Sequence, residues 1–165
     1  MMDTPIVKRT AWVYTIPQLL VMLSVMLLIW TFFLPDDFVL ASIYGALACL
    51  VYSFGSRALL LRNHKRGISL TKLGSYRDAI REFHLSYDFL NQHSWLDKYR
   101  VITMLDSSAV PYREMALCNI AYLHVQLNEP SVALQFYKEA LDHFPESELA
   151  KDGVEHIQSA HLVES

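Results

Sequence analysis

The chain has 165 residues, of which 53% are apolar, with 14 Lys and Arg against 17 Asp and Glu. Its mean hydropathy of +0.21 is high for a soluble protein, and the apolar excess lies in the first 61 positions. From residue 73 onwards acids outnumber bases by fourteen to seven and form no basic stripe, so we expect no nucleic-acid partner.

Two uncharged apolar runs, residues 11–34 and 38–55, are separated only by Pro35, Asp36 and Asp37. At about 1.5 Å of rise per residue, the first run is long enough to cross a hydrocarbon core of about 30 Å, and the second is near the minimum. The first run also exceeds the roughly 7–15 apolar residues of a cleaved signal peptide. We therefore expect an N-terminal tail at 1–10, transmembrane helices at 11–34 and 38–56, and a turn between them at 35–37.

Basic residues flank this hairpin on both sides, whereas its turn carries only acids. Because Lys and Arg near span ends favour the cytoplasm, we predict that both termini are cytoplasmic and the turn external, in an integral protein of a bacterial inner membrane. The basic residues either only set this orientation or also bind anionic lipid. They are Lys8 and Arg9 before the first span, and Arg57, Arg62, Lys65, Arg66 and Lys72 after the second.

Small residues recur every four positions along the second span and therefore share one helix face. In lipid, small residues allow helix backbones to approach closely. This stripe is expected to pack against the first span, or alternatively to pair two copies of the chain as a homo-oligomer. Its members are Ala41, Gly45, Cys49 and Ser53.

Residues 57–165 show apolar residues at helical spacing and no alternating strand pattern, so the predicted fold class is all-α. The pattern is most specific over residues 113–146, where two helices are expected on either side of a turn at 128–130. Small residues stand where the two helices would cross, and an aromatic residue stands where it would fill the gap between them. The positions are Leu117, Ile120, Ala121, Ala133, Tyr137, Ala140 and Pro145.

These positions resemble the tetratricopeptide repeat, a 34-residue helix–turn–helix unit. A weaker copy lies at about 60–91, where Gly67, Ala79, Phe83 and Ser86 match the stronger pattern and Asn91 replaces its closing proline. The first helix of this copy follows the second span directly, so the span is predicted to continue into it with a bend at Gly55. The domain would then be held rigidly at the membrane.

Residues 92–112 form an insertion between the copies, and residues 147–161 are predicted to form a terminal capping helix. In the insertion Trp95, Tyr99 and Ile102 share one helix face. We expect this face to close the core of the domain. The alternatives are a helix on the membrane surface and a contact with a partner.

The resemblance implies a protein-interaction scaffold in which the first helix of each repeat lines a groove for a peptide or helix. In this chain the groove would have an apolar centre, and Cys118 and Tyr122 stand at two of the places where chaperone-binding members carry a carboxylate clamp. The implied groove residues are Met115, Cys118, Asn119, Tyr122, Val125 and Gln126, with His64, Ile68, Thr71 and Lys72 from the weaker copy.

No enzyme, cofactor or metal site is expected. The seven histidines are dispersed without a ligand spacing, and Cys49 and Cys118 are interpreted as reduced packing residues. The favoured function is a membrane-anchored adaptor for an unidentified protein, which could be an accessory subunit of an envelope transport complex. The alternative is a structural membrane component that self-associates through the small-residue stripe.

Overall fold

The computed structural model describes residues 12–106 and 108–164, with side chains for 15–106 and 108–159. These residues contain nine helices and no strand, so the predicted all-helical class is confirmed. The helices fall into two compact units. We call them the hairpin unit, from Lys8–Leu61 and Trp95–Ala109, and the array unit, from Arg62–Ser94 and Val110–Ser165, and describe each separately.

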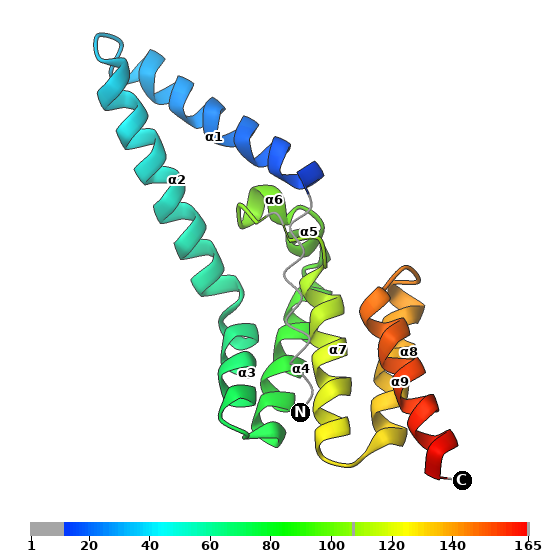
Figure 1. Ribbon diagram of the computed structural model, residues 1–165. Coiled ribbons are helices and arrows are strands. Elements are labelled where there is room, and N and C mark those ends of the chain that lie inside the picture. Colours follow the sequence, from blue (N-terminus) through cyan, green and yellow to red (C-terminus); the bar gives the residue numbers. More distant parts are fainter. Residues whose placement is uncertain (1–11, 107, 165) are drawn as a thin grey trace. The chain divides into compact units, whose positions relative to one another are not determined.

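The hairpin unit begins with helices α1 (Trp12–Phe32) and α2 (Phe38–Leu60), which meet at a tight turn (Figure 1). Asp37 caps α2, because its carboxylate accepts a hydrogen bond of 2.9 Å from the Leu40 amide. Thr15–Phe32 and Phe38–Leu60 are both long and apolar enough to cross a membrane. None of the first stretch is buried, and few residues of the second are. These helices are therefore not the core of a folded domain.

The small residues of α2 lie against α1. Ala41, Gly45 and Cys49 are buried, and a Cβ at Gly45 would lie 2.7 Å from the Met26 Cγ and 3.1 Å from its Cα. The structure thus uses this part of the stripe within the chain. Ser53, the last member of the stripe, instead donates a hydrogen bond of 3.4 Å to the Met104 carbonyl.

The break between α2 and the next helix lies further along than predicted. Gly55 is inside α2, which continues to Leu60 before the chain enters α3 at Arg62. The buried Leu61 ends α2, and its amide donates to the Arg57 carbonyl at 3.2 Å. The bend expected at Gly55 was wrong, because the α-helix can pass through a single glycine at a modest cost in free energy.

The insertion forms two short helices, α5 (Ser94–Lys98) and α6 (Arg100–Thr103), and its part from Trp95 to Ala109 belongs to the hairpin unit. The expectation that its apolar face closes the core of the helical domain was therefore wrong. Trp95, Tyr99 and Ile102 are 55%, 52% and 55% exposed. The residues that the segment buries are instead Leu96, Asp97, Arg100, Met104 and Leu105.

The array unit consists of α3 (Arg62–Lys72), α4 (Tyr76–Gln92), α7 (Tyr112–Gln126), α8 (Pro130–His143) and α9 (Glu148–Glu164). Each packs against the next along the chain, and α9 also reaches α7 (Figure 1). The turn before α4 uses Gly74 at φ 75°, and the turn before α8 uses Asn128 at φ 59°. Ser147 begins α9 by accepting a 3.1 Å hydrogen bond from the Ala150 amide.

The helix pairs α3/α4 and α7/α8 bury most of the positions that the sequence pattern matched, although Pro145 is exposed. Two glycines lie close to aromatic rings: a Cβ at Gly67 would stand 3.0 Å from the Phe83 ring, and one at Gly153 of α9 would stand 2.3 Å from the Tyr137 ring. A glycine thus packs against an aromatic side chain where α3 meets α4 and again where α8 meets α9. The buried equivalents are Gly67 and Ala121, Ala79 and Ala133, Phe83 and Tyr137, and Ser86 and Ala140.

Candidate functional site

Helix α7 is the central helix of the array unit, since α4, α8 and α9 all pack against it. None of its residues is fully exposed. One side contributes its large side chains to two buried clusters, through Leu117, Ile120 and Leu123 among others. The side that remains half-exposed carries residues spaced four, three and four apart, which place them on one helix face. We call Met115, Asn119, Tyr122 and Gln126 the α7 strip.

Helix α3 adds less to this face than the sequence predicted. Ile68 and Tyr122 both pack on the buried cluster around Phe83. The Thr71 hydroxyl donates to the Gly67 carbonyl of its own helix at 2.9 Å, and Lys72 is exposed. The α7 strip is therefore the part of the predicted groove that the structure brings together.

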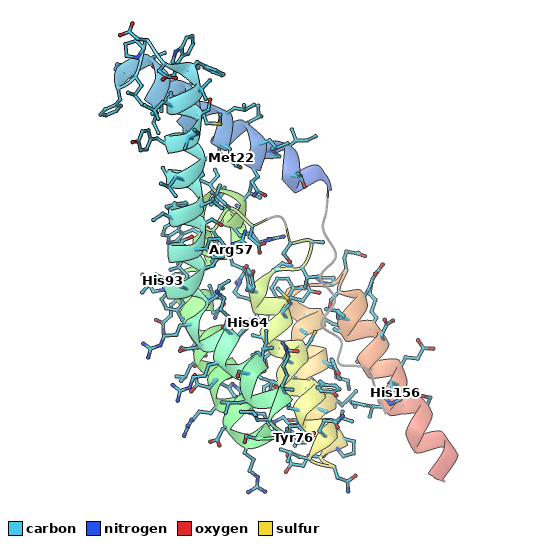
Figure 2. All side chains as sticks on the ribbon, turned by 60° about the vertical axis from the view of Figure 1, so that its left-hand side comes forward. Met22, Arg57, His64, Tyr76, His93 and His156 are labelled. Atoms are coloured by element: carbon cyan, nitrogen blue, oxygen red, sulfur yellow. The ribbon has the colours of Figure 1, made fainter. Side chains whose placement is uncertain are left out.

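Three predicted groove residues belong to the core instead. Cys118 is buried among the residues that join α7, α8 and α9, and Val125 packs on the same cluster. His64 is buried with its ring centroid 5.3 Å from those of Phe83 and Tyr112, both in edge-to-face geometry (Figure 2). His64 thereby links α3 to α7 inside the unit. The physical reason is that α3 and α7 both pack on α4, so the residues facing α4 cannot face a partner.

Burial makes these side chains chemically inert at neutral pH. It lowers the pKa of His64 to about 4, so the ring is neutral, and its Nδ1 has no hydrogen-bond partner among the described residues. Burial, assisted by Glu114, raises the pKa of the Cys118 thiol to about 12. A protonated thiol is a poor nucleophile and a poor metal ligand. In the described side chains no group of three or more His, Cys, Asp or Glu is placed to hold a metal ion.

The α7 strip itself is uncharged. Burial, with a smaller effect of Tyr76, raises the pKa of Tyr122, so its phenol stays neutral and can both donate and accept a hydrogen bond. Elsewhere in the array unit, Arg66 pairs with the buried Glu82 carboxylate at 3.3 Å, and the His124 Nδ1 lies 2.6 Å from a Glu129 carboxylate oxygen. The strip therefore offers apolar, amide and phenol groups to a ligand and no net charge.

A second arrangement, in the hairpin unit, was missed by the sequence analysis. The Arg57 Nε donates to the Met104 carbonyl at 2.9 Å, a terminal nitrogen of the same side chain donates to the Leu105 carbonyl, and that nitrogen lies 3.6 Å from the Asp106 carboxylate (Figure 2). The Tyr52 hydroxyl lies 3.2 Å from the Ile102 carbonyl and 3.1 Å from the Thr103 carbonyl. Side chains of α2 thus hold the end of the insertion.

One signal in the sequence could have revealed this contact. Arg57 is followed by Ala58, Leu59, Leu60 and Leu61, so it lies inside an apolar stretch and not at its end. A charge in such a stretch is usually paired or bonded to backbone carbonyls.

Comparison with protein-family models, curated proteins and solved structures gives no match, so the function has to be argued from the geometry of the chain itself.

Proposed function

We propose that this chain is a membrane-anchored protein-interaction module, with α1 and α2 as a transmembrane hairpin and the array unit holding a partner through the α7 strip. The observation that carries the proposal is a central helix with one uncharged, partly buried side between helices that bury much of the rest of it. Such a side is a surface that a helix or peptide of another protein can cover. Catalysis is not part of the proposal, because the most perturbed titratable groups are buried in the core.

The tetratricopeptide interpretation supports the choice of helix. In that architecture the first helix of each pair lines the binding face, and these helices are α3 and α7 here. Burial of equivalent positions in both helix pairs agrees with two related repeats, with α9 as the cap that the end of such an array needs.

Connectivity supports a role close to a membrane. In its described part the chain passes between the two units after Leu61, after Ser94 and after Ala109. An array unit joined to a transmembrane hairpin at three points cannot move far from the bilayer. The basic residues after α2 support a cytoplasmic position of this unit by the positive-inside rule, and we propose a bacterial inner membrane as its location.

The chemistry of the strip indicates the class of partner. Met115 and Tyr122 offer apolar area, while the Asn119 and Gln126 amides can pair with polar groups at the edge of a bound segment. No lysine–arginine clamp for a carboxylate is present on the strip. The partner segment is therefore an amphipathic helix or an apolar peptide, bound by its side chains and not by a charged terminus.

The test is affinity purification of the full chain from its native membrane in mild detergent. We compare wild type with Tyr122→Ala, Gln126→Ala and the control Tyr87→Ala, which truncates another half-buried tyrosine of the array unit. We expect a partner that is retained by the control and lost by the two strip variants. Retention by all variants would contradict the proposed site.

The alternative, self-association through the small-residue stripe, would give only the chain itself, in a defined oligomer unaffected by Tyr122→Ala. No structural observation favours it, since Gly45 lies against Met26 of the same chain.

A further inference from the structure

We infer that residues 95–106 form an interfacial element whose Trp95, Tyr99 and Ile102 side chains insert into the headgroup–acyl boundary of the cytoplasmic leaflet. This inference rests on the transmembrane hairpin of the proposed function but not on the α7 strip. It assigns a ligand, the lipid bilayer, to an apolar face that the fold leaves uncovered.

Helix α2 holds the insertion at a depth that follows from helix geometry. Tyr52 is fourteen residues beyond Phe38, so it lies about 21 Å along the helix from the turn. A hydrocarbon core of about 30 Å that begins at Phe38 therefore ends about 9 Å beyond Tyr52, on the cytoplasmic side. The Tyr52 hydroxyl bonds the carbonyls of Ile102 and Thr103, which brings these residues to the same depth.

The backbone of the insertion is bonded largely by side chains of α2. The carbonyls of Ile102, Thr103, Met104 and Leu105 follow one another at the end of α6, where a helix leaves its last carbonyls without intrahelical partners. The Tyr52 hydroxyl shares its one proton between the first two carbonyls, and Arg57 donates to each of the last two. In water, these carbonyls could accept hydrogen bonds from solvent and would not need side-chain donors. Non-helical backbone at membrane depth has no water, so it needs donors from the protein.

Side chains of the insertion itself also donate hydrogen bonds to its backbone carbonyls. The buried Arg100 guanidinium donates to the carbonyls of Asp97, Ser108 and Ala109, with its shortest bond 2.7 Å long. The Thr103 hydroxyl donates to the Leu96 carbonyl at 2.8 Å. These bonds direct polar groups inward and leave the apolar face outward.

Exposed apolar side chains occur both on the insertion and on the helix that holds it. Trp95, Tyr99 and Ile102 are exposed, as are Phe54 and Leu59 of α2, the helix that holds the segment. The Lys98 ammonium lies 5.5 Å from the centroid of the Tyr99 ring, where it can also reach anionic headgroups. Trp, Tyr and Lys together are typical of the membrane–water interface.

The test measures lipid contact with an environment-sensitive fluorophore on single cysteines. The full chain carries Cys49→Ala and Cys118→Ala and is reconstituted in phosphatidylcholine–phosphatidylglycerol vesicles with or without nitroxide lipids. The fluorophore is placed at Ile102→Cys, at Leu47→Cys in mid-α2 as the lipid control, and at Leu85→Cys on α4 as the aqueous control. All three native side chains are about half exposed.

We expect the label at position 102 to show blue-shifted emission and lipid quenching roughly half as strong as at position 47 or stronger, with little quenching at 85. A label at 102 that behaves like the one at 85 would overturn the inference while leaving the partner purification unaffected. A label at 47 without lipid quenching would overturn both the hairpin and the interfacial element.

Discussion

A Cβ added at Gly45 of α2 would lie 2.7 Å from Met26 of α1, and one added at Gly67 of α3 would lie 3.0 Å from the Phe83 ring of α4, so both helix contacts are close. The large apolar side chains around these contacts are disposed in opposite ways. In the array unit Phe83, Ile120 and Leu123 are fully buried, whereas residues such as Leu47 and Phe54 of the hairpin unit face outward. The array unit thus removes its large apolar side chains from solvent, whereas the hairpin leaves them exposed on helices that are long and apolar enough to cross a membrane.

This difference predicts different sources of stability. Burying apolar area stabilises the array unit, since it removes that area from water. The hairpin gains little from apolar burial in lipid, so small-residue packing and side-chain bonds to backbone carbonyls define its structure.

Truncating a leucine should destabilise the protein much more in the array unit than in the hairpin unit. We expect Leu123→Ala to lower the free energy of unfolding by about 2–5 kcal/mol, because it leaves a cavity between α4 and α7. The same truncation at the outward-facing Leu47 should change it by less than about 0.5 kcal/mol. Denaturant unfolding in mild detergent, followed by circular dichroism, measures both. Equal losses of unfolding free energy in Leu123→Ala and Leu47→Ala would contradict the interpretation that the two side chains face different surroundings.

Acid should destabilise the array unit through His64. Its pKa is about 4 in the folded chain against 6.5 when unfolded, so the unfolded state binds the proton more readily. Stability is therefore fully present above pH 6.5 and is lost as the pH falls to about 4, by about 3 kcal/mol in total. Unfolding measured across this range should show the loss in wild type, and His64→Leu should flatten the profile. An unchanged slope in the variant would show that another group is responsible.

Filling the close contact of α1 with α2 should affect only the hairpin. Gly45→Ile places a branched side chain against Met26 and should cost about 1–3 kcal/mol. The matched variant Leu47→Ile alters a neighbouring outward-facing position and should have almost no effect. Thermal unfolding in detergent measures both, and a similar change in the two variants would place the helix contact elsewhere on α2.

Removing one hydroxyl should loosen the insertion. Tyr52→Phe deletes the donor to the carbonyls of Ile102 and Thr103, at a cost of about 0.5–1.5 kcal/mol. Tyr44→Phe is the control, because Tyr44 lies exposed on the same helix. Amide exchange of residues 102–106 should rise in the first variant and stay unchanged in the second. Equal exchange in both would show that this hydroxyl does not hold the segment.

The sequence predicted the features that depend on residues close together in the chain. The apolar runs and Pro35-Asp36-Asp37 between them indicated the hairpin, and the twelve-residue spacing of Ala121 and Ala133 indicated a close helix crossing. Both features reflect helical geometry acting within one or two elements.

The features that it did not predict depend on distant partners. An apolar face at Trp95, Tyr99 and Ile102 can be read from spacing, but spacing does not say what covers it. The Arg57 bond to the Met104 carbonyl spans 47 positions and involves an acceptor that every residue has, so no side-chain pattern marks it. For the same reason His64 could not be distinguished from a surface residue of its helix, because its burial depends on Phe83 and Tyr112.

The most direct test of the central claim is the accessibility of single cysteines in intact cells, in a background of Cys49→Ala and Cys118→Ala. A membrane-impermeant maleimide should label Asp36→Cys, in the turn between α1 and α2, without permeabilisation. It should label His93→Cys only after the membrane is opened, and Leu47→Cys in neither case. Labelling of positions 36 and 93 from the same side, or rapid labelling of position 47, would contradict a transmembrane hairpin that holds the array unit in the cytoplasm.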